Sequence, residues 1–534
     1  MSLISRPLFT FLLLGLGLFS QTIAAETSCR EGEVFEDRNG NRQRDAGEPG
    51  LPGVRISNGH NVVRSDRRGR YRLMPTSTSS REAFVIKPPG YVVARRDDGM
   101  PDHWRDAHQA NRCDFGLKVE RPTRARTDGL RVLVFGDPQP KSLVDVGHYA
   151  RGIVDSVLAN TPATMLDTRG TWAGQAADLG LTLGDVVDDD LSLYPAIKRE
   201  TARMHVPWLH APGNHDINLD AKDDDRALSG FHEAFGPDTF AWEEPEASFI
   251  ALDNVIWQPA SSPKYIGGFR ENQFAFLEAY LSEARKDRLL VLAMHIPLFE
   301  QAERDTFRDA DRTRLFALLQ RFPHVLLLTA HNHTQQHVFH GAETGWYGTH
   351  PLHEYNVGAT CGAFWSGVKD AGGVPVSTMA DGTPKGWARL LVKQGGRYDL
   401  SYHPARSAGQ AMHLHAPKVL RHGAYPAWGI YANVYMGDDE SVVDYRVDGG
   451  DWRAMRKVSQ PDPQLLAENR RDDEAEVLRG YDRSPEATPS PHLWRGALPT
   501  ELSIGAHQVE VRVRLRDGAV HSATTSYRLE AASP

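Results

Sequence analysis

The sequence predicts an α/β core that lies between two β-rich regions, each expected to form a β-sandwich domain. Between residues 130 and 400, apolar strand-like runs alternate with helical stretches, which is typical of α/β folds. On either side of this region the chain has short β-type runs separated by turns. The 534 residues include 47 glycines and 33 prolines, and this favours many turns over long helices.

Length and composition place the chain among ordinary globular proteins. Hydrophobic residues make up 40% of the chain and charged residues 24%, which excludes a mostly disordered protein. At about 150 residues per domain, the length corresponds to three or four domains. The 61 basic and 69 acidic side chains give a net charge of −8. Because dedicated nucleic-acid binders carry a strongly basic domain, we expect no nucleic-acid partner.

The first 25 residues predict a secretory signal peptide. Arg6 precedes an apolar run from Pro7 to Phe19, and the small residues Ala24 and Ala25 follow it. This run is shorter than the about 20 residues that a membrane-spanning helix needs, although an uncleaved anchor is the alternative. No later segment is apolar enough to span a bilayer. We therefore expect an exported protein, periplasmic or secreted, with no transmembrane segment after signal removal.

Residues 26–122 are predicted to form the N-terminal β-sandwich domain. Candidate strands are Val54–Ile56, Tyr71–Leu73 and Ala83–Ile86. Before them, oxygen-bearing side chains follow the spacing of a twelve-residue calcium loop: Asp37, Asn39, Asn41, Asp45 and Glu48. Arg42 stands where such loops usually have glycine. The loop is therefore either a calcium site or a turn closed by its own hydrogen bonds.

Three cysteines occur in the chain, and an odd number leaves at least one without an intramolecular partner. An exported protein can form disulfides. Cys29 and Cys113 bracket the N-terminal region, so either a bridge between them or two free thiols is compatible with the sequence. Cys361 lies in a glycine-rich stretch and is expected to be a small buried residue rather than a nucleophile.

The predicted strands of residues 130–400 end in side chains that can bind metal ions. Leu130–Phe135 precedes Asp137 and Gln139, Leu179–Leu183 precedes Asp185 and Asp188, Val206–Ala211 precedes Asn214, His215 and Asp216, Leu289–Met294 precedes His295, and Val325–Thr329 precedes His331 and His333. A single Asp after a strand is more often a helix N-cap, and a single His is more often a hydrogen-bond partner. Functional sites of α/β folds form at the carboxyl ends of strands. Five such ends in order therefore predict one site at a common edge.

Residues 401–534 are predicted to form the C-terminal β-sandwich domain. The candidate strands are Trp428–Tyr435, Val442–Val447, His507–Val513 and Ala523–Leu529. Residues 458–490 are polar and rich in proline, so they are predicted to be a long loop.

The ordered series Asp-x-Gln, Gly-Asp-x-x-Asp, Gly-Asn-His-Asp, His and Ala-His-x-His resembles the calcineurin-like metallophosphoesterase superfamily. The runs Gly358–Gly367 and Met379–Gly386 are similar to a bacterial exported subgroup with dedicated N- and C-terminal β domains around the catalytic core. The resemblance implies a four-layer core of a β-sandwich flanked by helices, within residues 130–400. It also implies a hydrolase, a phosphatase that cleaves phosphomonoesters or phosphodiesters.

The same resemblance implies two divalent metal ions and a set of residue roles. The first ion would bind Asp137, Gln139, Asp185 and His333, and the second would bind Asp185, Asn214, His295 and His331. Mn, Fe or Zn suits this mixture of oxygen and imidazole ligands. The ions would activate a hydroxide for in-line attack on phosphorus. His215, oriented by Asp216, would assist the leaving group.

The sequence departs from the family pattern at the first motif, where Gln139 replaces the usual His. An amide oxygen is a weaker ligand than imidazole, so the alternative function is a non-catalytic, metal-stabilised envelope-binding protein. Three residues that follow the last predicted ligands are candidates for substrate binding, namely Trp365, Lys369 and Lys385, and Phe364 and Trp387 on the same segments are further candidates for the pocket lining. The alternative is that they are core aromatics and surface lysines.

Overall fold

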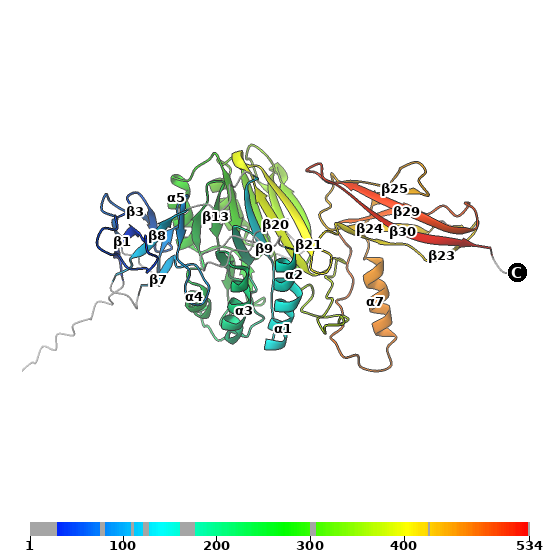
Figure 1. The fold of residues 1–534 in the computed structure, drawn as a ribbon, viewed down its shortest axis with the longest axis horizontal. Helices are drawn as coiled ribbons and strands as arrows, with labels where there is room; N and C mark the ends of the chain where they lie inside the picture. Colours follow the sequence, from blue (N-terminus) through cyan, green and yellow to red (C-terminus); the bar gives the residue numbers. More distant parts are fainter. Residues whose placement is uncertain are drawn as a thin grey trace, which may run out of the picture.

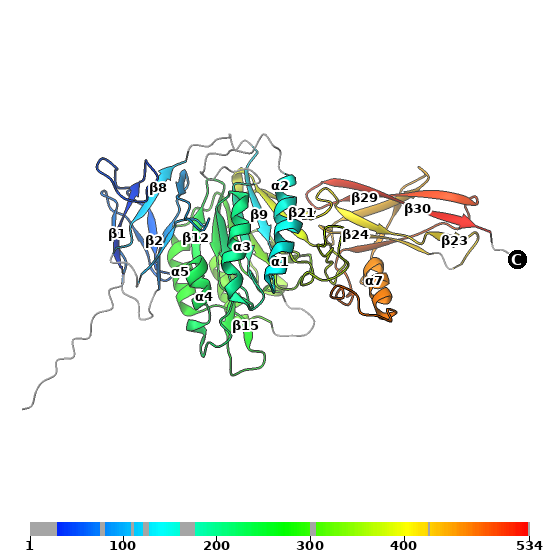
Figure 2. The same ribbon diagram turned by 60° about the horizontal axis from the view of Figure 1, so that its bottom comes forward.

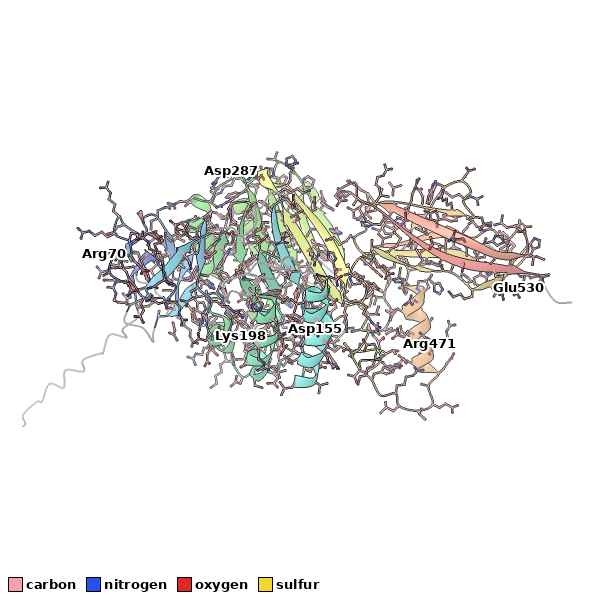
Figure 3. The ribbon with its side chains drawn as sticks, in the orientation of Figure 1. Arg70, Asp155, Lys198, Asp287, Arg471 and Glu530 are labelled. Carbon is pink, nitrogen blue, oxygen red and sulfur yellow. A yellow bond between two sulfur atoms is a disulfide. The ribbon has the colours of Figure 1, made fainter. Side chains whose placement is uncertain are left out.

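The computed structural model describes residues 29–74, 81–107, 112–120, 128–160, 177–299, 306–425 and 428–531. The predicted signal peptide lies outside these ranges. Figure 1 shows an elongated molecule with the N-terminal sheets at one end, the C-terminal sheets at the other and the central region between them. Arg70 and Glu530 lie near the two opposite ends (Figure 3). Within the described ranges, every helix is too short or too polar to cross a bilayer.

The N-terminal region consists of two four-stranded sheets, with strand orders β4-β1-β8-β6 and β3-β2-β5-β7. The strands are β1 (Glu31–Glu36), β2 (Arg55–Ser57), β3 (Val62–Arg64), β4 (Arg70–Arg72), β5 (Glu82–Ile86), β6 (Tyr91–Val93), β7 (Trp104–Asp106) and β8 (Phe115–Val119). Alternating apolar residues such as Val34, Ile56 and Phe115 are fully buried. A disulfide joins Cys29 to Cys113 and so ties the start of the region to β8.

The Asp/Asn-rich loop after β1 is closed by its own hydrogen bonds. Asp37 is buried and accepts hydrogen bonds from three backbone N–H groups of the loop. Asp45 accepts from the side-chain amides of Asn39 and Asn41, each at 2.7 Å. The carboxylate of Glu48 accepts from two further backbone N–H groups. These bonds are those of an Asx-type turn, and calcium binding by this loop stays a prediction.

The central region is built on a five-stranded sheet, ordered β11-β10-β9-β20-β21, and a six-stranded sheet, ordered β12-β13-β16-β17-β19-β18. The first contains β9 (Leu130–Phe135), β10 (Leu179–Leu183), β11 (Trp208–Ala211), β20 (Gly386–Val392) and β21 (Tyr398–Pro404). The second contains β12 (Phe240–Glu243), β13 (Ala247–Ala251), β16 (Leu289–Ala293), β17 (Val325–Thr329), β18 (Gln336–His340) and β19 (Leu352–Asn356). A hairpin of β14 (Val255–Trp257) and β15 (Tyr265–Gly267) projects beside them.

Helices accompany both central sheets, so the predicted α/β class is confirmed. They are α1 (Leu143–Tyr149), α2 (Asp155–Ala159), α3 (Tyr194–Thr201), α4 (Ser229–Phe235), α5 (Glu271–Ser282) and α6 (Asp309–Leu319). Helices α1, α2 and α3 lie beside β9 in both ribbon views (Figure 1 and Figure 2). Strands β10 and β16 are buried on both faces, which explains why their sequences are continuous apolar runs rather than alternating ones.

The five strand ends singled out in the sequence come from two sheets rather than one. Strands β9, β10 and β11 pair in parallel in the five-stranded sheet, whereas β16 and β17 pair in parallel in the six-stranded sheet. An isolated bridge between Gly136 and Ala359 links the segment after β9 to the segment after β19. The side chains that were expected at the edge of one sheet therefore lie along the line where the two sheets meet.

The C-terminal region has a sheet ordered β22-β24-β28-β27 and a sheet ordered β23-β30-β29-β25-β26. Its strands are β22 (Met412–His415), β23 (Val419–Arg421), β24 (Gly429–Val434), β25 (Val442–Val447), β26 (Arg453–Ala454), β27 (Arg456–Lys457), β28 (Leu493–Ala497), β29 (Gly505–Arg514) and β30 (Val520–Glu530). The expectation of a loop throughout residues 458–490 is wrong, because this segment contains α7 (Pro463–Asp473). Asp462 caps α7 by accepting from two backbone N–H groups, and Pro463 occupies its first turn.

The N-terminal and central regions share one hydrophobic core, which also takes in Tyr435 after β24, whereas the rest of the C-terminal core forms a second cluster. Phe84 on β5 packs against Phe240 and Phe276 of the central region, with ring centroids 6.5 and 6.0 Å apart. Lys87, which is almost fully buried, forms a 2.6 Å ion pair with Glu244. Buried pairs of this kind fix the relative position of two regions, because removing one partner leaves an uncompensated charge.

Candidate metal centre

Seven side chains converge where the two central sheets meet. They follow β9 (Asp137 and Gln139), β10 (Asp185), β11 (Asn214), β16 (His295) and β17 (His331 and His333). His295 Nε2 lies at the centre of the cluster. It lies 3.3 Å from Asp185 Oδ1, 3.0 Å from Asn214 Oδ1 and 3.1 Å from His331 Nδ1.

The remaining predicted ligands lie around Asp137 and Asp185. His333 Nε2 is 3.8 Å from Asp137 Oδ1, and Gln139 Nε2 is 3.3 Å from Asp185 Oδ2. Asp185, His295 and His331 form one of the described groups whose ligand atoms all lie within 4.8 Å of one another. The structure thus brings together all seven residues that were predicted as metal ligands.

Five of these seven residues have left-handed backbone conformations. The φ angles are 43° at Asp137, 44° at Gln139, 48° at Asp185, 70° at His331 and 49° at His333. Left-handed φ costs free energy for any residue with a Cβ atom, and such positions gather at functional sites. Tight left-handed turns at the strand ends direct the side chains into the gap between the sheets instead of continuing the strands.

Backbone hydrogen bonds hold these turns in place. The N–H of Gln139 donates to Asp185 O at 3.0 Å, and the N–H of His215 donates to Asp185 Oδ1 at 2.9 Å. His295 Nδ1 lies 2.8 Å from Leu183 O, which makes Nδ1 a protonated nitrogen and directs Nε2 at the other side chains of the cluster. A Cβ on Gly184, whose φ is +89°, would lie 2.5 Å from His295 Nδ1, so only glycine fits here.

The pKa values in the cluster indicate that a bound cation would stabilise it. Burial raises the pKa of Asp137 to about 8, which disfavours its ionised form at neutral pH. Burial lowers the pKa of His331 to about 3 and that of His333 to about 4, so both imidazoles are neutral. Neutral imidazoles and buried carboxylates are the donors that a divalent cation needs, and its charge would favour ionised Asp137.

His215 lies at the rim of the cluster and is held by two carboxylates. Its Nδ1 is 3.0 Å from Asp188 Oδ1 and 2.8 Å from Asp189 Oδ1. Burial alone would lower the pKa of His215, but the hydrogen bonds to these residues and the charge of Asp185 raise it to about 10. The sequence did not single out Asp189, because it lies one position beyond the recognisable motif.

The structure gives Asp216 a different position from the one expected. Its carboxylate accepts hydrogen bonds from the backbone N–H groups of Val186 and Gly213 and from Tyr194 Oη. It therefore joins the turns after β10 and β11, while Asp188 and Asp189 orient the ring of His215. A buried carboxylate that binds several N–H groups is a typical structural clamp between loops.

The candidate substrate-binding residues occupy three different environments. Trp365 is buried, and its indole N–H donates to Pro138 O at 2.9 Å. Lys385 is also buried; its Nζ donates to Pro375 O and lies 5.1 Å from the centre of the Trp365 ring. Burial lowers the pKa of Lys385 to about 8. Lys369 is exposed and its backbone pairs with Pro375.

Two aromatic residues flank the imidazoles of the cluster, and one of them, Phe364, was a candidate for the pocket lining. Phe364 is 44% exposed, has a left-handed φ of 54°, and its ring centre is 4.7 Å from that of His333. Tyr265 on β15 meets His331 edge-on at 6.1 Å. Lys141 Nζ lies 4.9 Å from the centre of the Phe364 ring and 3.6 Å from Asp188 Oδ2. Contacts between separate loops cannot be seen in a single sequence, which explains why Tyr265 and Lys141 were missed.

Comparisons with known proteins agree with the geometry. Residues 130–335 match the family model described as Calcineurin-like phosphoesterase. Residues 37–120 match the N terminal of Calcineurin-like phosphoesterase, and residues 354–521 match the C terminal of Calcineurin-like phosphoesterase. No curated protein matches the chain.

Two solved structures are distant matches to this chain. The purple acid phosphatase PPD1 from yellow lupin (Lupinus luteus) seeds is 13% identical, with 67% of each chain covered and a TM-score of 0.36. The structure of PhoD is 10% identical, with 71% of this chain and 89% of that chain covered and a TM-score of 0.35. The three family models cover consecutive parts of the sequence and, between them, most of its length. The chain therefore belongs to the calcineurin-like phosphoesterase family, with its dedicated N- and C-terminal domains, and is a hydrolase that acts on phosphoester bonds.

Proposed function

We propose that the protein is an exported phosphoesterase in which the seven clustered side chains hold two divalent metal ions. The observation that carries this proposal is the convergence of Asp137, Gln139, Asp185, Asn214, His295, His331 and His333 at the junction of two sheets. Five of them adopt left-handed backbone conformations to reach it. Asp185, near both sets of donors, is the proposed bridging ligand.

The donor set fits divalent ions of the Mn, Fe or Zn type. Two buried carboxylates, two amide groups and three imidazoles provide hard oxygen and borderline nitrogen ligands. When bound, such ions supply Lewis acidity that lowers the pKa of water and offsets charge on phosphoryl oxygens. Gln139 contributes an amide where an imidazole would bind more strongly, so one of the two positions is proposed to be the weaker.

His215 is proposed to hold the proton that the leaving group receives. Among the described residues, its polar contacts are made through Nδ1, with Asp188 and Asp189. These carboxylates favour the protonated ring and leave Nε2 as the nitrogen that would donate the proton. Proton transfer from Nε2 to an alkoxide or phenoxide leaving group would complete cleavage of a phosphomonoester or phosphodiester.

Export is supported by the covalent structure of the N-terminal region. Disulfides form and persist in oxidising compartments, and Cys29 is bonded to Cys113. The predicted signal peptide precedes this bridge by only a few residues. Periplasmic or secreted location is therefore proposed, and cell fractionation with an antibody against the C-terminal region would test it.

Turnover of chromogenic esters tests the proposed chemistry. Purified protein would be treated with a chelator, resupplied with Mn²⁺, Fe²⁺, Zn²⁺ or Ca²⁺, and assayed with p-nitrophenyl phosphate and bis(p-nitrophenyl) phosphate. We expect a transition metal to restore turnover, and Asp185→Asn to lower kcat by at least about 100-fold because it weakens both positions. The matched control is Asp287→Asn; Asp287 is exposed (labelled in Figure 3) and precedes β16, at the opposite end of that strand from His295.

The outcome of this assay decides between a metal-dependent phosphoesterase and a non-catalytic, metal-stabilised envelope-binding protein. Full activity in Asp185→Asn, or activity that survives complete chelation, would contradict the metal-dependent proposal. The ratio of the monoester rate to the diester rate assigns the substrate class.

A further inference from the structure

A cleft on the C-terminal region, remote from the strand ends of the metal centre in sequence, has the features of a ligand site. It lies between the outer face of the sheet β22-β24-β28-β27 and the start of α7, and its volume is about 580 Å³. Small-molecule sites commonly occupy about 300–1,000 Å³. The side chains used below are His415, Trp428, Tyr431, Gln460, Leu466 and Arg495, all of which line the cleft.

The floor of the cleft is a row of side chains on adjacent strands. His415 on β22 is the register partner of Tyr431 on β24, and Tyr431 is the partner of Arg495 on β28. Arg456 on β27 is in turn the partner of Arg495. Directly opposed residues of neighbouring strands lie on the same face of a sheet. The row therefore presents an imidazole, a phenol ring and two guanidinium groups in order.

The aromatic part of this row is ordered and accessible. Arg495 Nε donates to Tyr431 Oη at 3.3 Å, and its guanidinium lies 5.8 Å from the centre of the Tyr431 ring. Trp428 precedes β24 and is 57% exposed, and Leu466 on α7 is also exposed. Large apolar side chains that stay exposed around a cavity mark surfaces that bind a ligand.

The charges around the cleft select the sign of that ligand. Among its described lining residues there is no aspartate or glutamate, whereas Arg495 is present and Arg456 adjoins it. Guanidinium groups bind carboxylates through paired hydrogen bonds. A ligand with both an apolar ring face and a carboxylate complements the aromatic and the cationic halves of the cleft.

The cleft is also fixed in shape by hydrogen bonds at the start of α7. Asp462 caps the helix and contacts His413 Nε2 at 2.8 Å and Asn433 Nδ2 at 3.1 Å. Asn433 Nδ2 donates as well to Asp381 O at 2.9 Å, in the loop between β19 and β20. The wall formed by α7 is thereby anchored both to the sheet beneath it and to the central region. A preformed site needs little ordering when its ligand binds.

We propose that this cleft binds an acidic saccharide, that is, a chain of sugar rings that carry carboxylates. The C–H face of a sugar ring would lie on Trp428 and Tyr431, which combine a flat apolar surface with a polar edge. Its carboxylate would pair with Arg495 and Arg456. Its hydroxyl groups would bond with Gln460 and His415. A proline-rich peptide also suits aromatic grooves, but its uncharged backbone offers no carboxylate to the cationic half of the cleft.

Calorimetric titration of the full-length chain tests this assignment without depending on turnover. The probes are trigalacturonate and trimannuronate as acidic trisaccharides, cellotriose as the neutral one, and a proline-rich decapeptide. We expect at least one acidic trisaccharide to bind at least tenfold more tightly than cellotriose and the peptide. Trp428→Ala should weaken this binding at least tenfold, while hydrolysis of p-nitrophenyl phosphate is unchanged.

Two further variants make the test specific. Arg456→Gln, at an exposed position, should lower affinity for the acidic trisaccharide and leave affinity for cellotriose as it was. Trp452→Ala is the matched control, since Trp452 lies on the other C-terminal sheet, beneath Arg446 and Arg512. No binding of either acidic trisaccharide, equal binding of cellotriose, tighter binding of the peptide, or undiminished binding by Trp428→Ala would each overturn the proposal.

Discussion

Gly184 illustrates how individual residues shape the metal centre. It follows β10, has a φ of +89°, and a Cβ placed on it would lie 2.5 Å from His295 Nδ1. That nitrogen lies 2.8 Å from Leu183 O, and this contact keeps His295 Nε2 directed at Asp185. Because Gly184 has no Cβ, the imidazole of His295 has room to keep this orientation.

Gly184→Ala should lower the affinity of the site for Mn²⁺ or Zn²⁺ by about 10- to 100-fold, because the added methyl group displaces His295. Metal titration followed by calorimetry would measure this loss. Gly449→Ala is the matched control: Gly449 has a similar φ of +73°, and a Cβ placed on it would have no described atom within 4 Å. Equal metal affinity in both variants would contradict the role given to Gly184.

Phe364 is the residue through which the rim of the centre can select a substrate. Its ring is exposed, contacts His333 and lies under Lys141. Stacking of an aromatic leaving group on such a ring contributes about 0.5–1.5 kcal/mol. Phe364→Ala should therefore raise KM for p-nitrophenyl phosphate about 2- to 10-fold, with little effect on KM for an alkyl phosphate. Steady-state kinetics on both esters would check this, and an equal change for both would refute it.

The sequence predicted which side chains cluster where the two sheets meet, but it did not predict most of the contacts at the rim of that cluster. Acidic, amide and imidazole side chains recur at fixed positions after apolar strands, so Asp137 or His331 can be found from spacing alone. The contact of Lys141 with Phe364 and that of Asp189 with His215 depend on how separate loops fold over one another. The expected partnership of His215 with Asp216 placed neighbours in sequence together, whereas the tight turn directs their side chains apart.

At the scale of elements, α4 and β5 are joined by an imidazole between two carboxylates. His232 on α4 has Nδ1 3.4 Å from Glu82 on β5 and Nε2 3.3 Å from Asp238. Burial alone would lower the pKa of His232, but these carboxylates raise it above its ordinary value. A raised histidine pKa means that this stabilisation is fully present below about pH 6.5 and is lost as the pH rises through the folded-state pKa.

His232→Gln should therefore cost about 1–3 kcal/mol of unfolding free energy at pH 6, where a buried charged partner is removed, and less at pH 9. Thermal unfolding of the wild-type protein and the variant across this range measures the difference. Lys198→Met is a useful comparison, because the ion pair of Lys198 with Asp98 joins the same two regions without a histidine. A wild-type advantage that is constant between pH 6 and pH 9 would refute the assignment.

Elements with strong local signals were predictable, and those that depend on tertiary contacts were not. Strands β9, β10 and β17 have the predicted bounds, since long apolar runs bury both faces of a strand. Helix α7 was missed because its segment is polar and contains prolines, although Asp462 and Pro463 form a recognisable helix start. The assignment of strand ends to two sheets follows from β20 pairing with β9, a contact across more than 250 residues that no local pattern reveals.

At the scale of the whole molecule, the two hydrophobic cores predict two unfolding transitions. One contains the N-terminal and central regions, whose buried side chains form a single cluster, and the other contains the C-terminal region. The Cys29–Cys113 bridge closes a loop with a sequence separation of 84 residues within the first unit. Loop-closure entropy gives such a bridge a stabilisation of about 4–5 kcal/mol.

Differential scanning calorimetry of the oxidised protein and of a Cys29→Ser/Cys113→Ser variant would show both effects. We expect the transition of the N-terminal and central unit to move to lower temperature in the variant, while the C-terminal transition stays in place. Three separate transitions, or an equal shift of both, would contradict the division into two cores.

The core that the N-terminal and central regions share also limits how this protein could change during evolution. Phe84 and Lys87 fill the surface of the central region around Phe240 and Glu244, so a chain that lost its first domain would expose apolar rings and a buried carboxylate to water. The C-terminal domain is tied to the central region as well, by the buried pair of His492 with Asp381 and by Tyr435, which belongs to the first core. Gene rearrangements that cut between the central region and either flanking domain would therefore expose buried apolar or charged side chains to water.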